Sequence, residues 1–208
     1  MRDSEDMRVS DAAAMIADRA EAEGLLLIHD QRLPSATALI AGEPIVGSWW
    51  SHPSAGVIYS ALASLDERFA TCKLVARKLT LVAPRLWAGL AAVGVAKLSW
   101  QIDRLSETDL GLLDLVEASP DPVLLNQPEL RACGRRLEAR LLVAVVEVHT
   151  DAGHHLRGLE AWSRWLQQRG VVQPLPDPAV AMDDFEHVLG RWGAALDALP
   201  WPSRTAPS

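Results

Sequence analysis

The sequence has few of the features that mark membrane proteins, disulfide-stabilised proteins or zinc proteins. Its 208 residues contain two cysteines, and neither Cys72 nor Cys133 has a second cysteine nearby, which excludes CxxC and zinc-ribbon motifs. Both lie among apolar neighbours, so we expect two buried free thiols. Apolar runs such as 86–95 and 141–148 are too short to cross a membrane. Because the acidic N-terminus does not read as a secretory signal, we expect a cytoplasmic protein that makes no membrane contact.

Motifs for catalysis are also missing. The sequence has no Gly-x-Ser-x-Gly nucleophile elbow, no phosphate-binding P-loop and no dinucleotide fingerprint. The segment 101–103 (Gln-Ile-Asp) is similar to the Gln-x-Asp motif of a winged-helix DNA glycosylase family, but those enzymes are much larger and so short a match does not identify one. We therefore name no catalytic residue and no cofactor, and we expect a binding module rather than an enzyme.

Three histidines fall within seven residues, at His149, His154 and His155, with Asp151 between them. On a β-hairpin, His149 and His154 would face each other across the turn. A zinc site needs three or four converging ligands, and the sequence offers no obvious further ligand elsewhere. Capping and hairpin hydrogen bonds explain the cluster more simply, so we predict no metal site.

The sequence does contain a balance of residues that is typical of a folded domain. Hydrophobic residues make up 49% and charged residues 23%, and the length suits one large domain or two small ones. The net charge is −7, and residues 1–23 and 171–208 contribute −4 and −3 of it. By contrast, residues 66–104 carry +4 and residues 129–140 carry +2. A local basic face can bind phosphate even when the total charge is negative.

The spacing of apolar residues predicts a helix-dominated α+β protein. Two segments, 71–83 and 143–159, alternate between apolar and polar residues and predict β-hairpins, while 25–29 is a short strand-like run. Helical spacing and breaking residues predict helices at 10–23, 34–42, 53–65, 84–93, 106–116, 128–140, 162–170 and 177–199. The apolar stripes of these helices predict that Leu62, Trp87, Leu90, Cys133, Leu137 and Trp192 are buried.

Both halves of the chain follow one order of elements: helix, loop, helix, hairpin. That order resembles the winged-helix architecture, in which a β-hairpin wing follows the helices. We therefore expect two winged-helix-like units, at 1–100 and 101–200, followed by a disordered tail at 201–208. Fold resemblance alone does not establish what these units bind.

The helix expected at 128–140 is the main candidate for binding. Its apolar stripe faces inward, and in a winged helix this element would enter the DNA major groove, with 143–159 as the wing. The predicted DNA contacts are Arg131, Arg135, Arg136 and Arg140, together with Lys73, Arg77 and Lys78 on the first hairpin. The alternative is an ordinary surface helix whose arginines pair with nearby acidic residues.

A second candidate lies in the loop 47–53, where Trp49, Trp50 and His52 follow one another closely. These side chains either line an aromatic pocket that stacks bases or holds a cation, or fill the seam between the two units. The sequence thus predicts duplex DNA or another protein as the partner, and it does not specify the oligomeric state.

Three segments resemble a bacterial protein family for which no activity is established. They are GEPIVGSWWSHP at 42–53, CKLVARKLTLVAPRLW at 72–87 and EVHTDAGHHLRGLEAW at 147–162. In that family a Gly-Lys turn is typical of the first hairpin, whereas this chain has Ala76-Arg77-Lys78, so we expect a turn of a different shape. The resemblance implies no catalytic residue.

Overall fold

A computed structural model describes residues 2–149, 155–171 and 174–202 of the chain. It shows a helix-dominated α+β protein with two three-stranded antiparallel sheets, which confirms the predicted fold class. The chain divides into unit 1, residues 1–86 and 187–195, and unit 2, residues 87–186 and 196–208. The chain returns to unit 1 close to its C-terminus. The division into winged-helix-like units at 1–100 and 101–200 stays a prediction.

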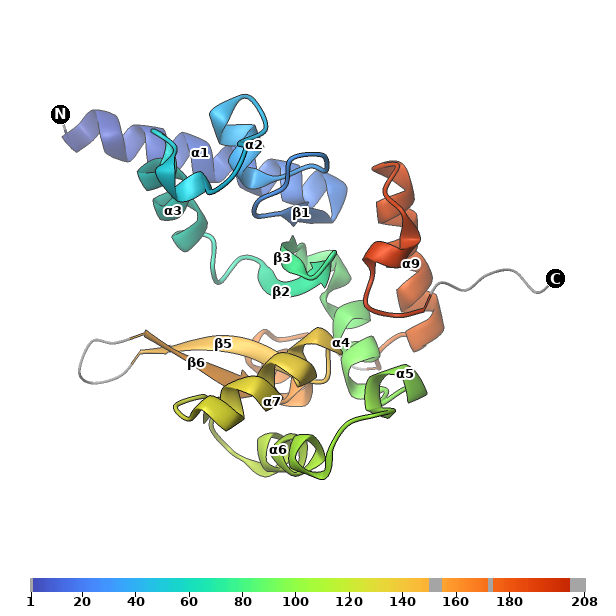
Figure 1. Ribbon diagram of the computed structural model, residues 1–208. Helices are drawn as coiled ribbons and strands as arrows, with labels where there is room; N and C mark the ends of the chain where they lie inside the picture. The colour runs from blue at the N-terminus through green and yellow to red at the C-terminus, as the bar shows by residue number, and fades with distance from the viewer. Residues whose placement is uncertain (1, 150–154, 172–173, 203–208) are drawn as a thin grey trace. The chain divides into compact units, whose positions relative to one another are not determined.

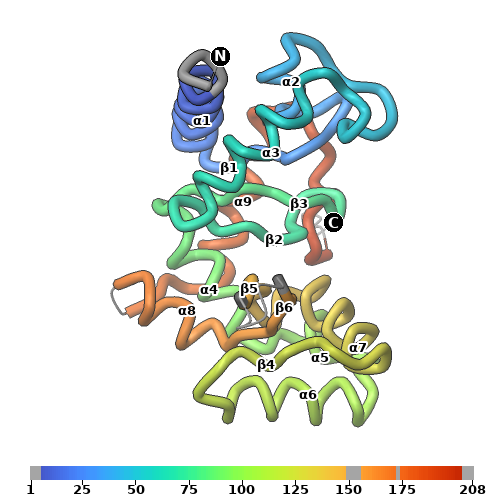
Figure 2. Tube along the Cα trace, turned by 90° about the vertical axis from the view of Figure 1, so that its left-hand side faces the viewer, coloured from blue at the N-terminus to red at the C-terminus, as the bar shows by residue number. Residues whose placement is uncertain are grey.

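Unit 1 contains helices on one side of a small sheet (Figures 1 and 2). The sheet has the strand order β1-β3-β2, so the first strand pairs with the second strand of the hairpin. Its elements are α1 (Arg2–Glu23), β1 (Leu25–Leu27), α2 (Ala36–Ala41), the 3₁₀ turn η1 (Trp49–Ser51), α3 (Ala55–Ala63), β2 (Ala70–Val75), β3 (Lys78–Val82) and the 3₁₀ turn η2 (Pro84–Leu86).

Local sequence explains where the helices of unit 1 end. Gly24 follows α1 with a φ of 91°, and a Cβ there would lie 2.5 Å from Arg85 Nη2, so this position favours glycine. The hydroxyl of Ser35 caps α2 by accepting a hydrogen bond from the Ala38 backbone N–H at 3.4 Å. Buried residues of α1, including Ile16, pack in the core of the unit with the sheet.

The β2–β3 hairpin has a two-residue turn formed by Ala76 and Arg77. Val75 pairs with Lys78, and both turn residues have positive φ values, 50° and 57°. Two-residue hairpin turns of this kind favour Asn-Gly or Gly, because other side chains crowd the backbone at positive φ. Lys78 therefore begins β3 and lies outside the turn. The sequence had suggested that Lys78 belongs to the turn together with Arg77.

Unit 2 is built around the second sheet, with the strand order β4-β6-β5. Figure 1 shows β5 and β6 as a long hairpin beside α7. The elements are α4 (Trp87–Val95), α5 (Ser99–Ile102), α6 (Glu107–Ala118), β4 (Val123–Leu124), α7 (Pro128–Ala139), β5 (Ala144–His149), β6 (His155–Glu160), α8 (Trp162–Gln168), α9 (Pro178–Arg191) and the 3₁₀ turn η3 (Leu196–Ala198). The end of α9 belongs to unit 1.

Capping residues define the two helices that frame the core of unit 2. Ser106 and Asp109 form the predicted capping box of α6, in which each side chain accepts a hydrogen bond from the backbone N–H of the other residue. Pro128 occupies the first turn of α7, where its missing N–H costs nothing. Cys133 and Leu137 on α7 pack with Val116 of α6 and with the sheet. The elements α5 and β4 escaped prediction because four and two residues are too few to show a period.

Burial follows most of the predicted apolar stripes. Trp87, Leu90, Cys133 and Leu137 are buried as expected. The prediction is wrong for Leu62 and Trp192, which are half-buried. Leu62 packs at the margin of the unit 1 core, and the indole N–H of Trp192 donates to a carboxylate oxygen of Glu23 at 3.3 Å.

Trp201 is also buried, although the sequence placed it in a disordered tail. Its ring meets that of Phe185 edge to face at 5.9 Å, and its N–H donates to Glu186 Oε1 at 2.9 Å. The expectation for residues 203–208 concerns positions outside the described part of the chain. Trp201 thus belongs to the core of unit 2.

The structure bears on two expectations from the sequence, the state of the cysteines and the absence of a membrane-spanning helix. Among the described residues, neither Cys72 nor Cys133 forms a disulfide, and both are buried, as predicted. Among the described residues, no helix combines the length and the apolar character that crossing a membrane requires.

Candidate functional site

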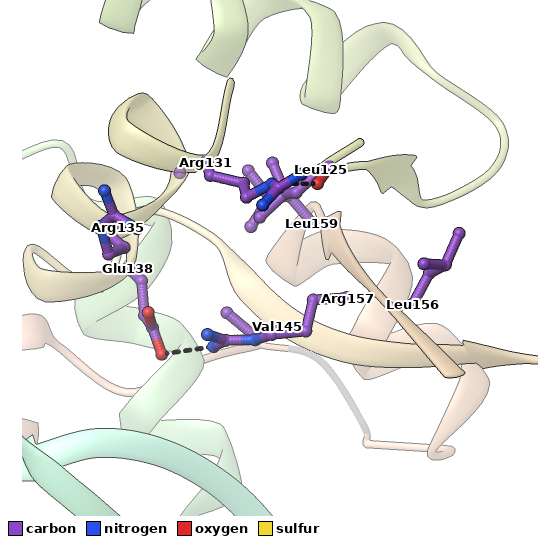
Figure 3. A pocket seen from close by; sticks show the side chains of 9 residues that line it. Leu125, Arg131, Arg135, Glu138, Val145, Leu156, Arg157 and Leu159 are labelled. Atoms are coloured by element: carbon purple, nitrogen blue, oxygen red, sulfur yellow. Dashed lines mark hydrogen bonds and ion pairs between the residues drawn. The ribbon is translucent and has the colours of Figure 1, made fainter. Parts of the chain in front are cut away.

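A pocket of about 170 Å³ lies between α7 and the β5–β6 hairpin of unit 2. Residues three, four and seven apart on α7 line it together because they share one side of the helix. Its charged lining residues are Arg131, Arg135, Glu138 and Arg157, and the others are Leu125, Gly134, Val145, Leu156 and Leu159 (Figure 3). The pocket therefore combines three guanidinium groups and one carboxylate with an apolar wall.

An ion pair joins the helix to the hairpin across this pocket. Arg157 Nη2 donates to Glu138 Oε1 at 3.0 Å, and Figure 3 shows the two side chains pointing toward one another. The side chain of Glu138 is 4% exposed, whereas that of Arg157 is 49% exposed. The pair thus holds the carboxylate inside and leaves the guanidinium at the rim, where it can meet a ligand.

Arg131 and Arg135 differ in what they contact. Arg131 donates from Nε to the Leu125 carbonyl at 3.2 Å and from Nη2 to the Asn126 carbonyl at 3.1 Å, which holds the loop before α7. Arg135 is exposed and has no hydrogen-bond or ion-pair partner among the residues that the structure describes. Since a guanidinium carries five N–H donors, Arg135 is the group best able to accept an added anion.

The other two predicted arginines of α7 lie outside the pocket and hold unit 2 together. Arg136 donates from Nε to both carboxylate oxygens of Asp109 at 3.0 Å. Arg140 donates from Nη1 to the backbone carbonyls of Trp100 and Gln101. The predicted cluster of four arginines is therefore split by the helical turn, with two at the pocket and two in internal contacts.

Burial and the neighbouring Asp109 carboxylate together set the pKa of the Cys133 thiol. Burial alone would raise the pKa of the Asp109 carboxyl, but hydrogen bonds from Arg136 and Ser106 outweigh it and hold that pKa well below its usual range. Burial raises the pKa of the Cys133 thiol, and the Asp109 carboxylate raises it further. Cys133 is therefore a neutral thiol at pH 7.

The basic residues predicted on the first hairpin belong to unit 1. Lys78 forms an ion pair with Asp30 at 2.5 Å, and Asp30 is buried and also accepts backbone N–H groups of the loop. Burial would raise the pKa of Asp30, yet hydrogen bonds from Lys78 and the backbone lower it. Arg77 lies exposed at the turn, and Lys73 is half-buried. The ammonium group of Lys78 is therefore engaged in an ion pair inside unit 1.

The tryptophan loop forms an exposed aromatic surface in unit 1. The rings of Trp49 and Trp50 stack at 4.1 Å, and Trp50 lies 5.6 Å from Tyr59 of α3. Trp50 is 60% exposed and Tyr59 is 55% exposed. His52 accepts a hydrogen bond from the Ser54 backbone N–H at 3.2 Å, so it supports the start of α3. We call Trp49, Trp50 and Tyr59 the aromatic patch.

The histidine segment lies largely outside the described residues. In the backbone register of the second hairpin, His149 pairs with His155, whereas His154 falls in the part of the chain that is not described. Among the residues that are described, no three His, Cys, Asp or Glu side chains gather closely enough to hold a metal ion. The absence of a metal site stays a prediction.

Arg157 is the site residue that sequence reasoning missed. It belongs to the predicted hairpin, whose period of two would have placed it on the same face as Leu159. The register confirms this pattern, because Arg157 pairs with Glu147 and Leu159 pairs with Val145. Only the packing of α7 against that face shows that Arg157 lines the same pocket as Arg131 and Arg135.

No protein-family model matches the chain, and searches of curated proteins and of solved structures return no significant match.

Proposed function

We propose that this chain is a non-enzymatic binding module that contacts duplex DNA through the arginines of unit 2. The observation that carries the proposal is the convergence of Arg131, Arg135 and Arg157 on one pocket between a helix and a β-hairpin. Guanidinium groups bind phosphate oxygens through paired, charge-assisted hydrogen bonds. In this proposal the pocket receives the DNA backbone, and we expect the protein to act in the cytoplasm.

The order of elements along the chain supports DNA binding by analogy with the winged-helix architecture. Unit 1 runs helix, strand, helix, helix, hairpin, and unit 2 runs α6, β4, α7, β5, β6, with the first strand beside the last in both sheets. We propose that both units are winged-helix-like, with α7 as the helix that enters the major groove and β5–β6 as the wing. The analogy concerns the fold and is not itself a reason to expect DNA.

Salt dependence gives the sharpest test. Three phosphate contacts predict that affinity for a labelled duplex falls about 40-fold between 50 and 200 mM salt. For Arg135→Ala, which leaves two contacts, the fall should shrink to about 12-fold, and for the Arg131→Ala/Arg135→Ala double variant to about 3-fold to 4-fold. Because Arg131 also holds a loop, circular dichroism must show that the double variant is folded.

The control variant is Arg8→Ala, which removes one positive charge from an exposed position on α1 in unit 1. It should leave the slope of log affinity against log salt unchanged. Absence of binding at 50 mM salt, or a slope that is the same in all variants, would remove DNA as the partner of this pocket.

The aromatic patch favours a second function, binding to another protein. Trp50 and Tyr59 are both exposed, and residues 33–65 contain one charged side chain, Glu43, in a chain with 47 Asp, Glu, Lys and Arg residues. Exposed apolar patches of this kind mark protein interfaces more often than phosphate-binding surfaces. Sedimentation velocity over a concentration series tests a second copy as the partner: a mass that rises in the wild type and not in Trp50→Ser would show it, and a constant mass would exclude it.

A further inference from the structure

The pocket of unit 2 has two chemically different sides. Leu125, Val145 and Leu159 form an apolar wall, and Arg135 and Arg157 stand at the rim with exposed side chains. A DNA phosphate would use the rim alone, since a phosphodiester has no apolar group to place against leucine and valine. The apolar wall therefore calls for a ligand that is itself two-sided.

The volume limits the size of that ligand. The pocket holds about 170 Å³, and an apolar cavity of about 150 Å³ in another protein accommodates benzene. Sites that enclose drug-sized ligands or nucleotides measure about 300–1,000 Å³. A single ring or a branched group of about six heavy atoms thus matches the space beside the apolar wall, with any charged group of the ligand lying outside it at the rim.

The width of the pocket depends on a glycine. A Cβ at Gly134 would lie 3.0 Å from Leu125 Cδ1 and 3.3 Å from Leu159 Cδ1, so any larger residue would press against the apolar wall. Gly134 is buried on α7, between the two pocket arginines of the helix. The helix can therefore carry charged side chains at the rim while its backbone stays close to the apolar wall.

The rim carries donors that the fold does not use. Arg135 has no hydrogen-bond or ion-pair partner among the described residues. Among the same residues, Arg157 donates to Glu138 from Nη2 alone, which leaves its Nε and Nη1 groups for a ligand. Glu138 is itself paired, so its charge does not face an incoming anion alone. Planar guanidinium groups recognise carboxylate and phosphate in a two-point geometry that a neutral amide cannot supply.

We propose that this pocket binds a small organic anion, in which one carboxylate or phosphate group carries a compact apolar group. The apolar group lies against Leu125, Val145 and Leu159, and the anionic group lies between Arg135 and Arg157. Because the same arginines would contact DNA phosphates, the ligand competes with DNA for the pocket. That competition rests on the proposed function, whereas binding of the ligand does not.

Three small probes separate the two halves of the recognition. Benzoate has both a ring and a charge, benzamide has the same shape without the charge, and acetate has the charge without the ring. Each is titrated into the ¹⁵N-labelled chain at constant ionic strength, and the amide signals of Gly134 and Gly158 are followed by NMR. The chemical shifts of these amides should change with added benzoate until binding is saturated. The affinity for benzoate should be at least tenfold above the affinities for benzamide and acetate.

Two single-residue variants test whether benzoate binds in this pocket. Arg135→Gln should weaken benzoate binding about tenfold, because glutamine keeps a polar side chain but loses the positive charge and the guanidinium fork, and Arg8→Gln should leave the affinity unchanged. Equal affinity for benzoate and acetate would reduce the pocket to an unspecific anion site and overturn the proposal. Equal affinity for benzoate and benzamide, or no effect of Arg135→Gln, would overturn it as well.

Competition is measured with labelled duplex, adding benzoate or the same concentration of potassium chloride. A larger loss of DNA binding with benzoate supports a shared site, and an equal loss overturns the competition. If benzoate binds and DNA does not, the proposed function fails and the ligand site stands. If DNA binds and benzoate does not, the ligand site alone fails.

Discussion

At the scale of single residues, Asp109 is a buried charged group that hydrogen bonds enclose. Its side chain is 2% exposed, and it accepts from Arg136 and from both the backbone N–H and the hydroxyl of Ser106. These contacts stabilise the charged form and keep the pKa of the carboxyl well below its usual range despite burial. One residue thus connects the start of α6 with the side of α7 that faces away from the pocket.

Replacing Asp109 should change how stability depends on pH. A depressed pKa contributes stability that is complete above about pH 4, the unfolded value, and is lost as pH falls toward the folded pKa. We expect Asp109→Asn to lower the free energy of unfolding by about 2–3 kcal/mol at pH 7, allowing for the half-exposed Arg136. Urea titrations from pH 7 to pH 3 should show this difference shrinking below about pH 4.

The matched control for this prediction is Asp114→Asn, an exposed position on the same helix. It should change stability by less than about 0.5 kcal/mol. A difference between wild type and Asp109→Asn that is the same at every pH would mean that the charge of Asp109 contributes nothing.

At the scale of elements, the β2–β3 turn is held in a backbone conformation that its side chains disfavour. Ala76 and Arg77 both have positive φ, and a residue with a Cβ in the left-handed region costs about 1–2 kcal/mol. The sheet overrides this local preference because β3 is its central strand and pairs with both β1 and β2. The turn is therefore an element that tertiary pairing imposes on its sequence.

Relieving this strain should stabilise unit 1. We expect Arg77→Gly to raise the free energy of unfolding by about 1 kcal/mol, because glycine adopts positive φ without steric cost. Arg77→Ala removes the same side chain but keeps the Cβ, so it should have little effect. Thermal or urea unfolding of the three proteins checks this, and equal stability of the Gly and Ala variants would contradict it.

The helix α7 serves two purposes at once. One face, with Cys133 and Leu137, packs in the core of unit 2, while Arg131, Gly134, Arg135 and Glu138 line the pocket. A period of 3.6 residues separates these faces without any break in the helix. The position of the pocket is therefore set by the same residues that fold the unit.

At the scale of the whole molecule, each unit is completed by a segment from near the C-terminus. Arg191 donates to the Glu23 backbone carbonyl at 2.7 Å within unit 1, and Trp201 packs on Phe185 within unit 2. The first contact joins residues that are 168 positions apart in the sequence, and the second joins the last residues of the fold to α9. Segments that extend beyond the last long helix are thus part of the fold up to Trp201.

Removing the Trp201 side chain should destabilise unit 2 strongly. Trp201 is 3% exposed, so we expect Trp201→Ala to cost about 3–5 kcal/mol, including the cavity that it leaves. The same change at the exposed Trp50 should cost less than about 1 kcal/mol. Denaturant unfolding distinguishes the two variants, and similar losses would show that Trp201 is not part of the core.

The sequence by itself determined the elements whose signal is local. Ser106 with Asp109 marked the start of α6, the alternation at 143–159 marked β5 and β6, and the stripe with Cys133 and Leu137 marked the inner face of α7. Capping and periodicity act over a few residues, so they can be read from a linear string.

Tertiary structure alone decided the features that depend on distant pairs. Arg157 and Arg135 line one pocket, and Arg136 forms an ion pair with Asp109. Arg140 donates to the carbonyls of Trp100 and Gln101. Trp201 is buried beside Phe185. Each partner lies on a different element, and no spacing rule links them. An arginine on a helix surface reads the same in sequence whether it binds an internal carboxylate or solvent, because only packing brings the carboxylate within reach.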